Sequence, residues 1–391
     1  MVALLRYLKK ITIRFVLKTL YVFPVKKNRI FLLNDLSYRY VGNPRFIGDY
    51  LLSEYPGVFE IVVSVGDVSA YKYLVDKGLK VVKFNSPMYF FYAITAAVFV
   101  SNSGGYSYIP VRKKQCVINT WHGGGAYKKC GIHMYEDTPL FRKDLLLSAN
   151  YTSIFLSTCS EFSKVMEDSM LIPREIFWEI GMPRNDMLLK QDKNKKDNIK
   201  RKIGLKDDEK LVLFAPTYRK IADNYFNDSI AISYGVDSKR VCKALEKRFG
   251  GHWKFAIRYH PCVVNRGEFH NDDVIDLSDY DEMQELLLIA DAMINDFSSS
   301  MWDYMLTEKP SFLFAKDLDH YIKTTEVYTP VEEWPFPKAT NNDELEANIM
   351  NFNIDQYKLA CKQHYKKLGG CESGCATKLV CDRIYQYCFQ N

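Results

Sequence analysis

Short apolar runs alternate with segments of helical periodicity along most of the chain, and they fall into two successive series. The runs of the first series are rich in β-branched and aromatic residues and too short for helices, as is typical of strands buried in a parallel sheet. These runs are Arg29–Leu33, Glu60–Val65, Lys80–Phe84, Ala97–Ser101, Gln115–Thr120, Ser153–Thr158 and Ile176–Ile180. The first series therefore predicts an α/β domain over residues 29–190.

A second series follows a strongly charged segment. Residues 190–210 are nearly free of large apolar side chains, so we predict a linker near 188–208. The later runs are Lys210–Ala215, Lys254–Tyr259, Val274–Leu277, Ala292–Asn295 and Ser311–Ala315. They predict a second α/β domain over 209–391. Two such series favour two doubly wound domains that face a cleft, with ligands at the carboxyl ends of the strands.

The N-terminal segment 1–28 has a different pattern, in which basic residues recur every four positions among apolar ones. The recurring residues are Arg6, Lys10, Arg14 and Lys18. The longest uncharged stretch, Thr19–Val25, is far shorter than the roughly 20 apolar residues that a membrane span needs. The segment predicts a basic amphipathic helix that lies in the interface of an anionic membrane. A helix packed on the protein body, with its lysines in water, is the alternative.

Charge and cysteine content narrow the functional class. The net charge of the 391-residue chain is +6, but residues 1–29 carry eight basic side chains and no acidic one, which leaves 45 basic against 47 acidic residues elsewhere. A basic coat for nucleic acid is therefore excluded. No signal-peptide pattern precedes the ten irregularly spaced cysteines, so we expect reduced thiols in a cytosolic protein. A zinc site at Cys371, Cys375, Cys381 and Cys388 is disfavoured by the absence of CxxC spacing.

Residues that can carry chemistry follow several predicted strands. His122, in the sequence WHGGG, comes directly after Gln115–Thr120. Such a histidine can act as a general base near neutral pH, although a structural histidine in a glycine turn fits equally well. In the second half, Pro216-Thr217-Tyr218-Arg219, His260 after Arg258, and Asp296-Phe297-Ser298-Ser299-Ser300 follow three strands. The serines fit either a helix N-cap or a phosphate cradle.

Other enzyme classes lack their parts in this sequence. There is no GxxxxGK[ST] motif, no GxSxG motif and no GxGxxG motif with an acidic residue about 20 positions later. The acidic pairs Asp272-Asp273 and Asp317/Asp319 follow no clear strand end. We therefore expect no obligatory cofactor, with Mg²⁺ as the one optional addition.

Five motifs follow one another along the chain: NTWHGGGAYKKCG (119–131), GMPRND (181–186), LFAPTYR (213–219), RYHP (258–261) and SDYDEMQELLLIADAMINDFSSSMWDYMLTEKP (278–310). Taken in order, they resemble the motifs of the CDP-glycerol glycerophosphotransferase family, which includes teichoic-acid primases, polymerases and capsule-type relatives. The resemblance covers about residues 95–390. It implies a GT-B-like pair of Rossmann-like domains and peripheral attachment to the cytoplasmic face of the bacterial membrane.

The resemblance also implies roles for individual residues. It makes His122 the general base on the acceptor hydroxyl and gives His260 contact with the donor pyrophosphate. Phosphate ligands are then Ser298, Ser299 and Ser300, with Arg219 and Arg258 in addition. We place the cytidine near Pro216, Thr217 and the segment Ser278–Met283, which includes Asp279. Gly124-Gly125 stand where the family commonly has Thr-Pro, a difference that bears on the acceptor pocket.

The expected reaction is transfer of a polyol phosphate from CDP-glycerol or CDP-ribitol to a hydroxyl of a lipid-linked or polymer acceptor, with release of CMP. The expected partners include an anionic membrane surface and no nucleic acid, and the oligomeric state is left open. The short basic N-terminal segment favours a compact enzyme, such as a primase or a capsule-type transferase. Two alternatives remain open, a GT-B glycosyltransferase that uses a nucleotide sugar and a nucleotide-binding scaffold without catalysis.

Overall fold

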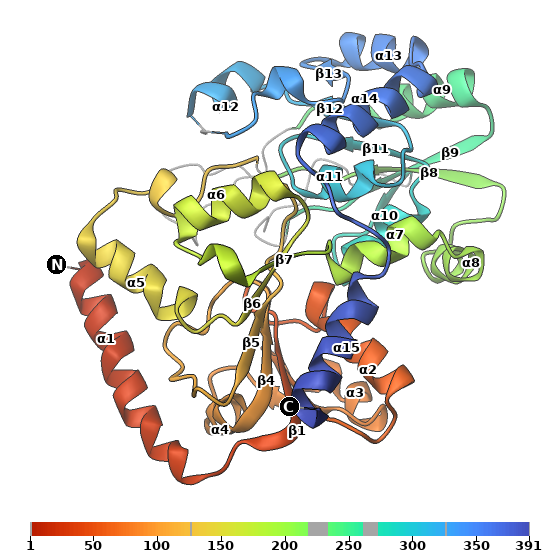
Figure 1. Ribbon diagram of the computed structural model, residues 1–391. Helices are drawn as coiled ribbons and strands as arrows, with labels where there is room; N and C mark the ends of the chain where they lie inside the picture. Colours follow the sequence, from red (N-terminus) through yellow and green to blue (C-terminus); the bar gives the residue numbers. More distant parts are fainter. Residues whose placement is uncertain (1, 126, 218–233, 261–272, 325–326, 391) are drawn as a thin grey trace. The chain divides into compact units, whose positions relative to one another are not determined.

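Figure 1 shows the computed structural model of the chain, which describes residues 2–125, 127–217, 234–260, 273–324 and 327–390. The chain divides into two compact units. Unit 1 comprises Met1–Asp186 together with Leu368–Asn391, and unit 2 comprises Met187–Lys367. Each unit has its own parallel sheet, as the two series of apolar runs predicted.

The sheet of unit 1 has seven parallel strands in the order β3-β2-β1-β4-β5-β6-β7. Every strand of the first predicted series is present. The strands are β1 (Lys26–Leu33), β2 (Glu60–Val65), β3 (Lys80–Lys83), β4 (Ala96–Ser101), β5 (Cys116–Asn119), β6 (Ile154–Ser157) and β7 (Phe177–Glu179). The strand order reverses between β1 and β4, so the crevice at their carboxyl ends is the expected ligand position in such a sheet.

Helices cover both faces of this sheet because successive residues of a buried strand point to opposite sides. Ile30 and Leu32 of β1 belong to one apolar cluster, whereas Phe31 and Leu33 belong to the other. Ile47 and Leu51 of α2 join the first cluster, and Tyr89 of α4 joins the second. The helices before the chain crosses to unit 2 are α1 (Val2–Leu17), α2 (Gly42–Glu54), α3 (Tyr73–Asp76), α4 (Pro87–Thr95), α5 (Pro139–Ala149) and α6 (Ser160–Met170).

Helix α1 lies beside α5 (Figure 1), and part of its basic stripe faces the rest of unit 1. The Lys10 ammonium lies 2.7 Å from the Asp144 carboxylate. Arg14 is buried, and its guanidinium donates to the carbonyl oxygens of Ser107 and Ile109 at 2.8 and 2.7 Å. The prediction that the lysines of this helix meet lipid or water does not hold for Lys10, which pairs with a carboxylate of unit 1 instead.

The opposite side of α1 is apolar and exposed. Its exposed large apolar side chains are Leu4, Leu5, Leu8, Ile11, Phe15 and Val16. The 3₁₀ helix Lys18–Val22 follows. Among the described residues, no helix combines the length and the apolar character that crossing a bilayer requires.

The C-terminal helix α15 (Ala376–Phe389) belongs to unit 1, which corrects the prediction that 209–391 form one domain. Its buried residues Val380 and Ile384 join the apolar cluster of Ile30. The Asp186 carboxylate accepts from the backbone N–H groups of Ala376 and Thr377 at 3.0 and 2.8 Å. These N–H groups at the start of the helix would have no partner within the helix itself. An apolar stripe on a helix does not specify which sheet the helix covers.

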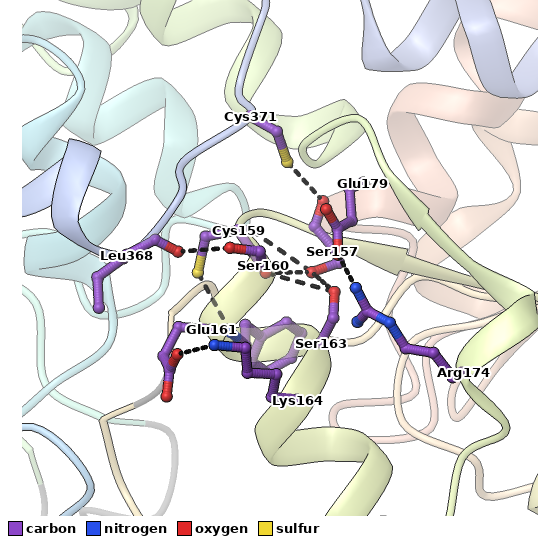
Figure 2. Close-up of polar contacts among 11 residues, drawn as sticks. Ser157, Cys159, Ser160, Glu161, Ser163, Lys164, Arg174, Glu179, Leu368 and Cys371 are labelled. Carbon is purple, nitrogen blue, oxygen red and sulfur yellow. Dashed lines mark hydrogen bonds and ion pairs between the residues drawn. The ribbon is translucent and has the colours of Figure 1, made fainter.

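The segment before α15 is tied to the carboxyl end of β6 (Figure 2). Cys159 forms an antiparallel bridge with Gly370, and the Cys371 thiol donates to the carbonyl oxygen of Ser157 at 3.3 Å. The Ser160 hydroxyl donates to the carbonyl oxygen of Leu368 at 3.4 Å. These contacts explain why the unit boundary falls at Leu368, before the helix itself begins.

The sheet of unit 2 has six parallel strands in the order β10-β9-β8-β11-β12-β13. The five predicted strands are present, and β13 is additional. The strands are β8 (Glu209–Phe214), β9 (His252–Ile257), β10 (Val274–Asp276), β11 (Ala292–Asn295), β12 (Ser311–Phe314) and β13 (Lys338–Ala339). Order again reverses, here between β8 and β11.

Helices also form in the predicted linker and between the strands of unit 2. The Asp192 carboxylate caps helix α8 by accepting from the backbone N–H of Lys195 at 3.0 Å, so most of the charged segment is helical. The helices of this part of the chain are α7 (Asp186–Lys190), α8 (Lys193–Lys202), α9 (Ser238–Phe249), α10 (Met283–Ile289), α11 (Ser300–Met305), α12 (Leu318–Thr324), α13 (Asn342–Met350) and α14 (Ile354–Lys367).

Candidate active site

His122 lies at the carboxyl end of β5 in unit 1, as predicted. The backbone N–H of Trp121 donates to the Asn119 side chain at 2.9 Å, and Trp121 adopts a positive φ of 52°. This turn stacks the indole of Trp121 on the imidazole of His122, with 4.5 Å between ring centroids. The imidazole is therefore held by its own neighbour in the chain before any distant contact is made.

The tautomer of His122 follows from one hydrogen bond. Nδ1 of His122 lies 3.0 Å from the carbonyl oxygen of Asn102, which can only accept. The proton of the neutral ring is therefore on Nδ1, and Nε2 carries the lone pair. A neutral imidazole with its Nε2 lone pair available is the form that removes a proton from a hydroxyl.

Burial lowers the pKa of His122 to about 4, and the positive charge of Arg184 acts in the same direction. The hydrogen bond to Asn102 opposes this effect in part. Because the pKa lies well below neutrality, His122 is in the unprotonated, base-competent form across the neutral pH range.

This lowered pKa predicts an unusual acid limb in the pH profile of the activity proposed below. Protonation removes the base only as the pH falls through the pKa of about 4, whereas an ordinary histidine titrates at 6.5. We expect kcat/KM for CMP release to persist to about pH 5 and then to fall, because this parameter reports the free enzyme. In Arg184→Met, which lacks the neighbouring positive charge, the acid limb should move to higher pH. An acid limb near pH 6.5 in the wild type would contradict the assignment.

Arg184 and Asn43 support the turn that carries His122, and neither was assigned a role from the sequence. Nη1 of Arg184 donates to the carbonyl oxygen of His122 at 2.5 Å. The backbone N–H of Arg184 donates to the Asn43 side chain at 3.0 Å, and the Asn43 amide donates to the carbonyl oxygens of Thr120 and Trp121. Both residues are buried, so they connect the ends of β5 and β7 to the start of α2.

Unit 2 brings another set of predicted residues together, at the ends of the neighbouring strands β8 and β11. Oδ1 of Asp296 accepts from the backbone N–H and the hydroxyl of Thr217 at 2.8 and 2.7 Å, and from the backbone N–H of Phe297 at 2.6 Å. Asp296 is only 1% exposed. The sequence placed Asp296 next to the serines but assigned it no role, and it determines the position of the Pro216-Thr217 turn.

The three serines after β11 differ in their surroundings. Ser300 is buried, and its hydroxyl accepts from the Asn295 amide at 2.8 Å and lies 3.0 Å from the Ser298 hydroxyl. Ser299 is exposed and Ser298 is half-buried. Ser298 and Ser299 are therefore accessible to a ligand, whereas Ser300 connects them to the strand. Their binding of phosphate remains a prediction.

Arg258 and the predicted nucleotide-binding segment meet at the ends of β9 and β10. The Arg258 guanidinium donates to the carbonyl oxygen of Tyr280 at 3.1 Å and to that of Asp281 at 3.3 Å. The adjacent Asp279 is exposed, as is His260, which follows β9. Arg258 thus holds the segment next to Asp279, and its direct contact with phosphate stays a prediction. Arg219 lies outside the described residues.

The described residues contain no group of three or more His, Cys, Asp or Glu side chains placed to hold a metal ion. Whether the reaction depends on added Mg²⁺ therefore stays a prediction. The nine described cysteines are free thiols.

Comparison with known proteins identifies the family. The model of the CDP-glycerol:poly(glycerophosphate) glycerophosphotransferase family matches residues 15–386. The chain belongs to this family. The match spans both units and contains all the candidate residues described above.

Two similar proteins are named for different polyols, one for glycerol and one for ribitol. The chain is 26% identical over 361 residues to the teichoic acid poly(glycerol phosphate) polymerase of Staphylococcus epidermidis, a match that covers 89% of this chain and 49% of the relative. It is 25% identical over 378 residues to the teichoic acid poly(ribitol-phosphate) polymerase of Bacillus spizizenii, covering 92% and 56%. The chain thus spans about half the length of these relatives.

A solved structure of the wall teichoic acid polymerase TagF, of a variant soaked with CDPG, resembles this glycerophosphotransferase family member over nearly its whole length. The TM-score is 0.79 at 25% identity, and the alignment covers 99% of this chain and 97% of the solved one. The two parallel-sheet α/β domains are therefore a feature shared with TagF.

Proposed function

We propose that this chain transfers a polyol phosphate, with glycerol phosphate as the first candidate, from CDP-glycerol to a hydroxyl of a membrane-linked acceptor and releases CMP. The observation that carries the proposal is the Nδ1 contact of His122 with Asn102, which leaves Nε2 as a base. Membership in the glycerophosphotransferase family and the solved TagF structure with CDPG support the donor.

The proposed reaction is a single phosphoryl transfer. Nε2 of His122 takes the proton of the acceptor hydroxyl while the oxygen of that hydroxyl attacks the phosphorus that bears glycerol. The bond from that phosphorus to the CMP oxygen breaks, and the new phosphodiester forms. Such reactions depend chiefly on positioning and electrostatic stabilisation.

In this proposal the donor occupies unit 2, with its phosphates at Ser298 and Ser299. His260 and the Arg219 and Arg258 guanidinium groups supply positive charge there, and the Pro216-Thr217 turn and Asp279 contact the cytidine. In this proposal His122, which acts on the acceptor hydroxyl, is a residue of unit 1.

The test is CMP release from CDP-glycerol and from CDP-ribitol, measured with a membrane-lipid acceptor, with and without EDTA. Acceptor-dependent CMP release supports the proposal and names the polyol. Release of UDP from a panel of UDP-sugars would instead make the protein a glycosyltransferase. Donor binding without any turnover, in the presence of competent acceptor, would favour a scaffold.

We also propose that the exposed apolar side of α1 enters an anionic membrane surface, so that the enzyme is attached peripherally at the cytoplasmic face. Phe15 is 75% exposed and Leu8 is 49% exposed on that side, and the exposed Lys9 and Lys18 lie next to it in the sequence. Apolar side chains that insert beside lysines bind to anionic lipid through both burial and charge.

This attachment predicts a large effect of charge on the apolar side of α1. In the double variant Leu8→Asp with Phe15→Asp, sedimentation with phosphatidylglycerol vesicles should be at least about tenfold weaker, since each buried side chain contributes roughly 1.5–3 kcal/mol. Leu359→Asp is the matched control, because Leu359 is an exposed leucine of α14. Equal binding of the double variant and the control would contradict the proposal.

A further inference from the structure

Asp35 and the loop Ser101–Gly105 lie where the strand order of unit 1 reverses. Asp35 follows β1, and the loop follows β4, the next strand in the sheet. This crevice is where a doubly wound sheet places its ligands. Asp35 could not be selected from the sequence, because no motif contains it and its strand ends in an ordinary loop.

One oxygen of the Asp35 carboxylate accepts all the hydrogen bonds that connect this side chain to the loop Ser101–Gly105. Oδ2 accepts from the Ser103 hydroxyl at 2.5 Å, from the Ser101 hydroxyl at 3.4 Å and from the backbone N–H of Gly105. A Cβ at Gly105 would lie 2.2 Å from this oxygen, so only glycine allows the approach. Gly104 adopts a φ of +103°, which glycine also favours.

The backbone of Asp35 adds a second connection to the same loop. Its N–H donates to Oδ1 of Asn102 at 3.0 Å. Asn102 is 5% exposed, and it is the residue whose carbonyl oxygen accepts the proton on Nδ1 of His122. Asp35 therefore holds both flanks of the peptide unit that determines the His122 tautomer.

The arrangement carries a cost that a purely structural turn has no need to bear. Oδ1 of Asp35 is buried and has no hydrogen-bond partner among the described residues. A buried polar atom left without a partner costs about 1–3 kcal/mol. Burial also raises the pKa of Asp35, while its hydrogen bonds to Ser103 and Gly105 oppose the rise. Such costs are typical of groups kept for a site.

We propose that Asp35 is a positioning residue for His122, because it holds the Asn102 carbonyl oxygen where it keeps the imidazole proton on Nδ1 and leaves Nε2 available to the acceptor. This inference rests on the proposed role of His122 as base. In a histidine that acts as a base, the ring nitrogen that does not take the proton commonly hydrogen-bonds to a carbonyl or carboxylate. A displacement of the catalytic group by about 1 Å can cost about 10²-fold in rate.

The direct test is the tautomer of His122, read by ¹⁵N NMR of histidine-labelled full-length protein at pH 7.5 without donor or acceptor. His122→Gln assigns the signal. We expect the Nδ1–H form in the wild type and a substantial Nε2–H population in both Asp35→Ala and Asn102→Ala. Asp76→Ala, at an exposed aspartate of α3, is the matched control and should keep the wild-type tautomer.

The kinetic test uses CMP release by the same variants. We expect kcat to fall about 10- to 100-fold in Asp35→Ala with the donor KM within about twofold, because the donor is not contacted. Ser103→Ala, which removes one hydrogen bond to Asp35, should have a smaller effect. If Asp35→Ala does not fold, Asp35→Asn and Asn102→Ala carry the test, with folding checked by thermal unfolding.

The outcomes separate this inference from the proposed function. An Nε2–H ring in the wild type, or an unchanged Nδ1–H ring in folded Asp35→Ala and Asn102→Ala, overturns the positioning role whatever the activity. A tautomer that changes as expected in a protein that releases no CMP would support the positioning role and overturn the proposed transferase.

Discussion

Substitution of His122 by alanine is expected to lower kcat for CMP release by about 10²- to 10⁴-fold, the range that a positioned general base contributes. Trp121, whose ring stacks on that of His122, cannot replace it as a base, because an indole N–H only donates. Binding of CDP-glycerol, measured by calorimetry, should change little, because the residues proposed to bind the donor belong to unit 2. Stopped or continuous assay of CMP with saturating donor and acceptor measures the effect.

His133→Ala provides the matched control, because His133 is an exposed histidine of the same unit. It should keep near wild-type turnover. Turnover close to wild type in a folded His122→Ala would show that His122 is not the base. Loss of CDP-glycerol binding in that variant would place His122 in the donor site instead.

The strands were predictable because a strand buried on both faces leaves a continuous apolar run in the sequence. β1, for example, ends in four consecutive buried apolar residues, Ile30 to Leu33, which follow the buried Arg29. β13 was missed because it has only two residues, Lys338–Ala339, which is too short for any pattern. The residues of helix α15 were assigned to the wrong domain, since an apolar helical stripe fits any apolar surface.

The candidate site was predictable where chemistry follows a strand directly, and not where it depends on contacts between distant segments. His122, Thr217 and the serines after β11 all follow from the strand-end rule. The support of His122 by Arg184 joins residues 62 positions apart, and that of the loop by Asp35 joins residues about 70 apart. Burial and hydrogen bonding of that kind leave no periodic signal.

The same limit explains α1. The spacing of Lys10 and Arg14 predicted one basic side of a helix correctly, but not which side faces the protein. Asp144 and the carbonyl oxygens of Ser107 and Ile109 decide the matter, and they come from segments about 100 residues later. A buried acceptor that needs a donor can therefore reverse the orientation that amphipathicity alone suggests.

The second large effect is expected at Asp296, whose carboxylate accepts three hydrogen bonds in the interior of unit 2. Asp296→Ala leaves the N–H groups of Thr217 and Phe297 without this acceptor, and each buried unsatisfied group costs about 1–3 kcal/mol. We expect the free energy of unfolding to fall by about 2–4 kcal/mol and the KM for CDP-glycerol to rise at least about tenfold. Urea unfolding and steady-state kinetics measure the two effects.

Two further variants separate the contribution to binding from that to stability. Asp296→Asn keeps the size and one acceptor oxygen, so it should lose less of both quantities than Asp296→Ala. Asp355→Ala, at an exposed aspartate of α14, should change the free energy of unfolding by no more than about 0.5 kcal/mol. If Asp296→Ala lost stability but kept the wild-type KM, the Pro216-Thr217 turn would have no part in donor binding. A rise in the KM for CDP-glycerol, measured where Asp296→Ala is still folded, would instead identify the turn as part of the donor site.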